Sequence, residues 1–302
     1  MWNSGVLKVQ PVDGIHYTTK YNGIVSEYPS NESRNQALTS SGEFDHARRF
    51  GGIARLYGEA ALQRLAQAHV CVVGIGGVGS WAVEALARSA VGELTLIDLD
   101  NIAESNVNRQ IHALDPEFGR AKVEAMAARV RAINPSCRVH PLEQFVEVES
   151  LEQLIHSGYD YLLDCIDSYR IKAALIARCR RLKLPLVTVG GAGGQRDPLK
   201  ITLGDLSRTE QDPLLSKTRK LLRQEYGFSR NPKRRFAVPC VYSREQPCAP
   251  LVEAAACDSG TAVTGLNCAG YGSAMTVTAS FALVAVAHLL ERLGGQQRQG
   301  ER

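Results

Sequence analysis

A glycine-rich turn is the first stretch of the chain whose residue types and spacing could do chemistry. Residues 69–79 read HVCVVGIGGVG, a short β-branched run that leads into a GxGxxG turn and then into a helical pattern. Glycines let the backbone approach a phosphate closely, and the amides and dipole of the following helix attract the anion. The turn predicts nucleotide binding through Gly74, Gly76 and Gly79, with Gly77 between them. Because GxGxxG occurs in domains of many chemistries, it does not choose a reaction.

Two acidic residues, Asp98 and Asp100, stand at the end of the next predicted strand, at residues 93–99. Asp98 and Asp100 lie about twenty residues beyond the glycines, where this architecture places an acid that binds the ribose hydroxyls. A strand-end acid that caps the next turn is the alternative.

Side chains that can donate hydrogen bonds gather in residues 105–110, which read SNVNRQ. In a helical turn Asn106, Arg109 and Gln110 share one face. A hydride-transfer enzyme does not need such a cluster, whereas a site that cleaves between phosphates needs fixed donors where charge builds up. Lys122 opens a further predicted helix, where a cation is unfavourable for the dipole, so we expect it to face an anion. A surface lysine is the alternative.

A third acid, Asp167, is the fourth residue of the motif DCIDS, which begins within the predicted strand at residues 161–165. Ligands of doubly wound sheets collect outside the carboxyl ends of strands. Asp167 therefore lies where a carboxylate can hold Mg²⁺ against a phosphate, with Ser168 beside it. The glycine-rich loop at residues 190–194 follows the next predicted strand and lets the backbone come close to a ligand.

Strands and helices alternate from about residue 45 onward, and this alternation predicts an α/β fold with a doubly wound, mostly parallel, Rossmann-like sheet. We expect one helix over residues 45–68. The apolar stretch at residues 274–290 is at the short edge of a membrane span, and we interpret it as a core or dimer helix in preference to a membrane helix. We divide the chain into a mostly disordered extension at 1–44 (a strand is possible at 6–17), a main domain at 45–293, and a polar tail at 294–302.

A basic insertion lies at about residues 207–240. Eight basic residues face only Glu225 within residues 217–235, a local charge of about +7 against +4 for the whole chain. Clustered cations bind the phosphate backbone of RNA, and Tyr226, Phe228 and Phe236 could stack on bases. A solvated charged helix is the alternative. The basic residues are Lys217, Arg219, Lys220, Arg223, Arg230, Lys233, Arg234 and Arg235.

The composition is that of an ordinary soluble globular protein, with 44% hydrophobic and 22% charged residues. No secretory signal opens the chain, so we expect a cytoplasmic protein whose eight cysteines are free thiols. None of them forms a CxxC pair, and we therefore expect no structural zinc. Cys240 is a candidate reactive thiol.

The motifs GIGGVG, LIDLD, SNVNRQ, GRAK and DCIDS occur in a fixed order, and together they resemble the ThiF/ubiquitin-activating superfamily, whose members adenylate carboxylates with ATP and magnesium. The segment RFGGIARLYG at residues 49–58, the loop GGAGGQRDP at residues 190–198 and the basic insertion narrow the resemblance to the tRNA threonylcarbamoyladenosine dehydratase family. The resemblance covers about residues 44–293.

The resemblance implies an ATP-binding adenylating domain that acts on tRNA, with the basic residues as tRNA contacts. Asp98 would bind the ribose, Asn106, Arg109 and Lys122 the triphosphate, and Asp167 the Mg²⁺. We rank Asp167 first for catalysis, with Arg109 and Lys122 beside it. Neighbouring residues complete the predicted ATP site: Gly77, Asp100, Ser105 and Ser168.

The resemblance also implies a homodimer and, more weakly, a sulfur-transfer or cysteine desulfurase partner. Relatives that activate sulfur carriers place a second arginine in the N-terminal motif, where this chain has Gly52. Arg49 or Arg55 could replace it as an arginine finger. Three other functions stay open: activation of a ubiquitin-like sulfur carrier, NAD-dependent oxidoreduction, and a non-catalytic tRNA-binding or sulfur-relay scaffold.

Overall fold

The computed structural model describes residues 18–21, 24–27, 44–248 and 271–295. The chain divides into two compact units, Met1–Arg49 and Phe50–Arg302. In the smaller unit β1 (Thr18–Tyr21) and β2 (Ile24–Glu27) form an antiparallel pair, with Thr18 opposite Glu27. The extension predicted to be mostly disordered thus includes one short strand pair. The strand considered at residues 6–17 lies outside the described residues.

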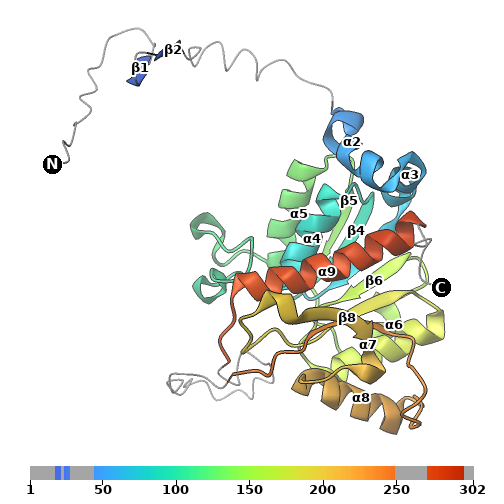
Figure 1. Cartoon of the computed structure of the whole chain (residues 1–302). Helices are drawn as coiled ribbons and strands as arrows, with labels where there is room; N and C mark the ends of the chain where they lie inside the picture. Colours follow the sequence, from blue (N-terminus) through green and yellow to red (C-terminus); the bar gives the residue numbers. More distant parts are fainter. Residues whose placement is uncertain (1–17, 22–23, 28–43, 249–270, 296–302) are drawn as a thin grey trace, which may run out of the picture. The chain divides into compact units, whose positions relative to one another are not determined.

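The larger unit is built on a seven-stranded sheet with the order β5-β4-β3-β6-β7-β9-β8 (Figure 1). All neighbouring strands are parallel except β8, which pairs antiparallel with β9 at the edge. The doubly wound, mostly parallel sheet predicted from the sequence is confirmed. The strands are β3 (His69–Val73), β4 (Glu93–Ile97), β5 (Arg138–Leu142), β6 (Tyr161–Asp164), β7 (Leu186–Val189), β8 (Ile201–Asp205) and β9 (Pro239–Ser243).

Helices cover both faces of this sheet. Helices α3, α4, α5 and α9 contribute to one hydrophobic core with Leu65, Leu86 and Phe281, and helices α6, α7 and α8 contribute to the other with Leu175 and Leu215. The α-helices are α2 (His46–Tyr57), α3 (Glu59–Gln67), α4 (Gly79–Arg88), α5 (Lys122–Ile133), α6 (Leu151–Leu154), α7 (Tyr169–Leu182), α8 (Pro213–Glu225) and α9 (Met275–Gly294). Short 3₁₀ helices are η1 (Glu104–Asn106), η2 (Asp115–Glu117), η3 (Pro198–Lys200) and η4 (Leu206–Arg208).

The order of the strands places a crevice between β3 and β6. These two strands are neighbours, with Val73 opposite Asp164, yet β3 leads into α4 on one face and β6 leads into α7 on the other. The loops after the two strands therefore diverge, and a crevice opens outside their carboxyl ends. All four residues of β6 are buried, as expected for a central strand with helices on both sides.

The single helix expected over residues 45–68 is wrong in one respect, because the structure has two helices there. Gly58, between α2 and α3, has a φ of +92°, a left-handed value that favours glycine. Such a residue cannot continue an α-helix, so the chain turns and α3 starts afresh at Glu59.

Helix α9 is apolar and long enough to cross a membrane by length and composition alone. Its residues Val277, Phe281 and Leu289 are nevertheless fully buried, and the helix packs on α3, α4 and the strands β7 to β9 (Figure 1). In this structure α9 is a core helix, which is the interpretation that the sequence favoured.

Candidate nucleotide site

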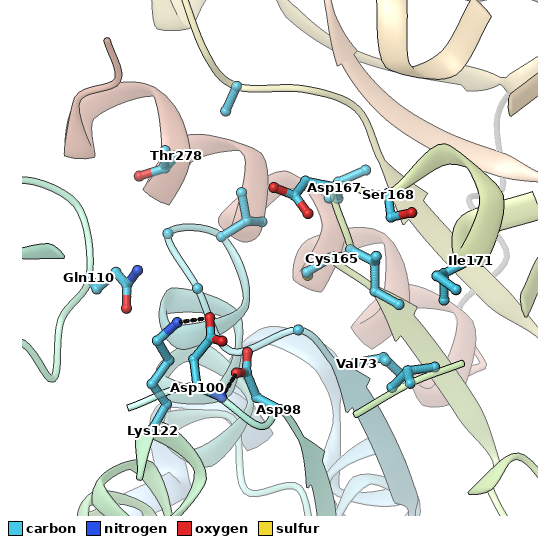
Figure 2. Close-up of a pocket in the computed structure, with 18 of the residues that line it drawn as sticks. Val73, Asp98, Asp100, Gln110, Lys122, Cys165, Asp167, Ser168, Ile171 and Thr278 are labelled. Atoms are coloured by element: carbon cyan, nitrogen blue, oxygen red, sulfur yellow. Dashed lines mark hydrogen bonds and ion pairs between the residues drawn. The ribbon is translucent and has the colours of Figure 1, made fainter. Parts of the chain in front are cut away.

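A cavity of about 650 Å³ opens at the carboxyl edge of the sheet, within the range typical of small-molecule sites. The ends of β3, β4 and β7 and the residues just after β6 line it. Residues of the segment 105–110, which we call the donor loop, and the start of α9 complete the lining. Figure 2 shows Asp98, Asp100 and Lys122 on one side of the cavity, with Asp167, Ser168 and Thr278 across from them. Of the twelve residues predicted to bind ATP, ten line the cavity: Gly74, Gly76, Gly77, Asp98, Asp100, Asn106, Arg109, Lys122, Asp167 and Ser168.

The glycine turn is shaped by close backbone packing. Gly74 has a φ of +88°, and a Cβ there would lie 3.1 Å from the carbonyl of Cys165. A Cβ on Gly79 would lie only 1.8 Å from the carbonyl oxygen of Gly74. Gly79 is not among the residues that line the cavity, and its lack of a side chain allows α4 to pack against the turn. Its contact with ATP stays a prediction.

Asp98 is the first residue after β4. Its carboxylate accepts the Ile75 N–H at 2.6 Å and the Asp100 N–H at 2.8 Å. Burial raises the pKa of Asp98, although the nearby Lys122 charge and these two amides oppose the shift. Each carboxylate oxygen keeps a free lone pair that can accept a hydroxyl, as ribose binding requires.

Lys122 is buried and reaches Asp100, with 2.7 Å between the ammonium and the carboxylate. The backbone joins the same two residues, because the Lys122 N–H donates to the Asp100 carbonyl. His112 is buried nearby, and burial, followed by the charges of Lys122 and Arg129, lowers its pKa to about 4. The anion that Lys122 meets in this structure is therefore Asp100.

The donor loop has the turn that its spacing predicts. The amides of Arg109 and Gln110 both donate to the Asn106 carbonyl, and Asn106 accepts the Ala103 N–H through its side chain. The Arg109 guanidinium donates to the Ser105 carbonyl at 2.7 Å, and burial lowers its pKa. Ser105 is not among the residues that line the cavity, and its carbonyl helps to orient Arg109, so its contact with ATP stays a prediction.

Asp167 is exposed at the mouth of the cavity, where no described residue forms a hydrogen bond or ion pair with its carboxylate. The loop that carries it starts from Asp164, which is fully buried. Asp164 pairs with Lys172 at 2.8 Å, and it accepts a hydrogen bond from Thr188 at 2.6 Å. A rigid base thus supports a carboxylate that is free to bind a ligand.

The cavity has further walls that the sequence did not reveal. Phe145 and Val146 follow the carboxyl end of β5, so the rule that ligands collect at strand ends could have indicated them. Arg170, in the first turn of α7, adds a cationic side chain to the lining of the cavity. Thr278 comes from α9, about 110 residues further along the chain, and its only sequence signal is a hydroxyl within an apolar helix.

The two candidate arginine fingers are not among the residues that line the cavity. Arg55 is exposed on α2. Arg49 belongs to the smaller unit, where its guanidinium carbon lies 5.1 Å from the centroid of the Phe44 ring. The structure of one chain leaves the finger a prediction.

The basic insertion is mostly exposed but its aromatic residues are not. Phe228 and Phe236 are buried and pack edge to face, 5.0 Å between ring centroids. They belong to the core with α7 and α8, so the idea that they stack on bases is wrong. Arg219 and Arg223 are half-buried: Arg219 donates to Thr209, and Arg223 lies over the Phe236 ring. Six cations remain exposed: Lys217, Lys220, Arg230, Lys233, Arg234 and Arg235.

Cys240 is not suited to be a reactive thiol. It is fully buried in β9, and burial raises its pKa well above the usual value. A reactive cysteine needs access and a thiolate, and Cys240 has neither, which corrects that prediction.

Comparison with known proteins agrees with this geometry. The ThiF family model matches residues 51–301. The chain is 52% identical to tRNA threonylcarbamoyladenosine dehydratase of Escherichia coli over 257 residues, which cover 83% of this chain and 96% of that enzyme. Crystal structures of the E. coli enzyme in complex with ATP and with AMP both match with a TM-score of 0.75, at 50% and 51% identity. They cover 84% and 82% of this chain, and 97% and 95% of the crystallised chains. The chain belongs to the ThiF family.

Proposed function

We propose that this protein is an ATP-dependent tRNA threonylcarbamoyladenosine dehydratase, which activates the threonyl carboxylate of the modified nucleoside and closes it into a ring. The observation that carries this proposal is the 52% identity to the E. coli enzyme, which covers 96% of that enzyme's length. The chain therefore shares far more with that enzyme than a nucleotide-binding fold.

In the first step a carboxylate oxygen of the substrate attacks the α-phosphorus of ATP. The bond from that phosphorus to the β-phosphate bridging oxygen breaks, and pyrophosphate leaves. Asp98 holds the ribose hydroxyls, and Arg109, Asn106 and Lys122 hold the phosphate oxygens on which negative charge develops. Catalysis is then mainly positioning and charge stabilisation, because these groups are fixed before the reaction.

The residues at the cavity mouth fit a magnesium ion. Mg²⁺ is usually bound through one or two carboxylates together with phosphates and waters, and Asp167 is an exposed carboxylate without a described partner. Asp167 would hold the ion, with the Ser168 hydroxyl nearby, and the ion would neutralise phosphate charge.

In the second step the neighbouring carbamoyl group of the substrate attacks the acyl-adenylate carbonyl. The bond to AMP breaks, a proton leaves the nucleophile, and the ring closes. Since both groups belong to the same nucleoside, the effective molarity is high and no protein nucleophile is required. The burial of Cys240 is consistent with a reaction that uses no thiol of this residue.

The exposed cations of the basic insertion would bind the tRNA backbone. Lys217 and Lys220 lie on α8, and Lys217 approaches the ring of Tyr169, the first residue of α7. The next residue, Arg170, lines the cavity. A basic surface therefore extends from the cavity rim along α8, as an extended polyanion requires.

A homodimer in the cytoplasm is part of the proposal. Leu283 on α9 is 53% exposed, Leu203 within the edge strand β8 is 39% exposed, and Leu199 just before that strand is 92% exposed. An edge strand with exposed apolar side chains suits pairing with a second copy. Light scattering of the purified protein should give twice the chain mass, and Leu283→Glu should shift it toward the monomer.

Exchange of labelled pyrophosphate into ATP tests the adenylation step. We expect exchange that depends on tRNA carrying threonylcarbamoyladenosine and is absent with the same tRNA lacking the modification. Exchange with a sulfur-carrier protein ending in Gly-Gly, and none with the modified tRNA, would contradict the proposal.

A further inference from the structure

Asp212 joins two parts of the molecule that have different tasks. It precedes α8, which carries part of the basic surface, and its Oδ1 accepts the Leu215 N–H at 2.9 Å as the N-cap of that helix. Its Oδ2 accepts the N–H of Gly191 at 2.9 Å, and Gly191 lines the nucleotide cavity. One carboxylate thus holds the start of α8 and the glycine loop at once.

The fit around Asp212 leaves no space for a looser arrangement. Asp212 is 5% exposed, and a Cβ on Gly190 would lie 2.1 Å from its Oδ2. The Gly190 N–H donates to the Val241 carbonyl, which fixes the end of β7 against β9. Any displacement of Asp212 therefore has to move the amide of Gly191, or break its hydrogen bond.

A buried lysine extends this link to the loop that carries Asp167. Lys172 is fully buried, pairs with Asp164 and also donates to Thr188 at 3.1 Å. Burial raises the pKa of Asp212, and its hydrogen bonds with the Leu215 and Gly191 amides, followed by the charge of Lys172, oppose that shift. Both loops on this side of the cavity, those after β6 and β7, thus rest on one network of buried charged and polar groups.

We propose that Asp212 is a positioning residue that couples the binding of tRNA on α8 to the binding of ATP in the cavity. A shift of α8 would reach the Gly191 amide through the two hydrogen bonds of the Asp212 carboxylate. Binding of tRNA then orders the glycine loop and increases the affinity for ATP, and ATP increases the affinity for tRNA by the same factor. The inference rests on the proposed function, because it requires that α8 contacts tRNA.

The serine variant separates the two hydrogen bonds of Asp212. In Asp212→Ser the shorter side chain still caps α8 but cannot reach Gly191. Asp212→Asn provides a second variant of nearly the same size, in which one oxygen caps the helix and the amide group would face the Gly191 N–H. Asp197→Ser is the matched control, because Asp197 caps the Leu199 N–H of η3 in the same way and does not line the cavity.

The experiment measures the dissociation constant of an ATP analogue with a methylene bridge between the α- and β-phosphates, with and without saturating tRNA that carries threonylcarbamoyladenosine. In the intact protein and in Asp197→Ser we expect the tRNA to lower this constant by about fivefold or more. In Asp212→Ser and Asp212→Asn we expect the factor to fall to about one, while each ligand alone still binds. Near-ultraviolet circular dichroism checks that the variants are folded.

Two results would overturn the coupling: an intact protein in which tRNA does not change the affinity for the analogue, or Asp212 variants that keep the full factor. Failure of the proposed function has another signature. It would appear as an intact protein that binds the ATP analogue but not the modified tRNA, and the coupling would then fall with it.

Discussion

The ammonium of Lys122 lies 2.7 Å from the carboxylate of Asp100, and the two side chains differ in exposure: 6% for the lysine and 72% for the aspartate. The buried cation cannot leave the cavity, whereas the exposed carboxylate can turn toward water. A triphosphate entering the cavity would therefore replace Asp100 as the partner of Lys122.

This exchange predicts opposite effects for the two partners. Lys122→Met should weaken binding of ATP by about 10- to 100-fold, the range expected for a hydrogen bond to a charged group. Asp100→Asn removes the competing carboxylate and should leave the affinity unchanged or increase it. Calorimetric titration with ATP checks both, and an Asp100→Asn variant that binds as poorly as Lys122→Met would contradict the exchange.

Replacement of two glycines of the turn by alanine should have different effects: one should lower the stability of the protein and the other its affinity for ATP. In Gly79→Ala the new Cβ meets the Gly74 carbonyl at 1.8 Å, so we expect a loss of about 3 kcal/mol or more in the free energy of unfolding. In Gly76→Ala the nearest atom is the Gln110 amide nitrogen at 4.0 Å, so the protein should fold normally. Because Gly76 lines the cavity, this variant should instead bind ATP more weakly.

Urea unfolding and ATP titration of both variants separate the two effects. A Gly79→Ala protein as stable as the parent, or a Gly76→Ala protein with unchanged affinity for ATP, would contradict the assignment of packing to one glycine and binding to the other.

His112 should make the protein sensitive to acid. Its pKa is about 4 in the folded protein against 6.5 ordinarily, so the unfolded chain binds the proton more readily between these values. The folded state keeps its full stability at pH values above the pKa of His112 in the unfolded chain. This stability is lost as the pH falls toward the pKa of His112 in the folded protein. Between about pH 7 and about pH 4.5 this residue should account for a loss of about 2–3 kcal/mol.

The variant His112→Leu should remove this contribution. Both ring nitrogens lack a hydrogen-bond partner within the described part of the chain, so an apolar side chain of similar size leaves no new unpaired group. Urea unfolding at the two pH values measures the difference, and an unchanged loss in the variant would show that another group is responsible.

The exposed cations should contribute through charge rather than through specific contacts. Replacing Lys217 and Lys220 by glutamine should weaken tRNA binding and reduce the magnitude of its salt dependence by up to about two counterions. The affinity for ATP alone should not change, because neither residue lines the cavity. Replacing Lys183, an exposed cation at the end of α7, by glutamine provides a control for the loss of one positive charge away from the basic insertion.

Periodicity and strand-end chemistry predicted most of the fold and much of the site. The apolar run Val70–Val73 and the alternation of strands and helices after it predicted a parallel sheet. Because the carboxyl ends of its strands lie at one edge, Asp98 and Asp167 line the same cavity. Contacts between elements distant in sequence could not be predicted in this way. The hydrogen bond that the Gly191 N–H donates to Asp212 depends on how α8 packs, and the position of Thr278 depends on how α9 packs. Local sequence patterns specify neither.

Side-chain burial was the other source of error. Phe228 and Phe236 stand between cations in the sequence, and this pattern suits both a base-stacking surface and a core. In the structure α8 packs on α7 and both rings are buried, so they belong to the core and not to a base-stacking surface. The same kind of tertiary contact buries Cys240 in β9.

Mass spectrometry of nucleosides tests the central claim most directly. Modified tRNA would be incubated with ATP, magnesium and either the intact protein or Asp167→Asn, a variant that keeps the shape of the side chain and removes its charge. The intact protein should convert threonylcarbamoyladenosine to a product lighter by one water, with release of AMP. The variant should be slower by about 10²- to 10³-fold, the cost of losing one stabilising group at a phosphoryl transition state. An unchanged nucleoside with the intact protein, under conditions where ATP binds, would contradict the account.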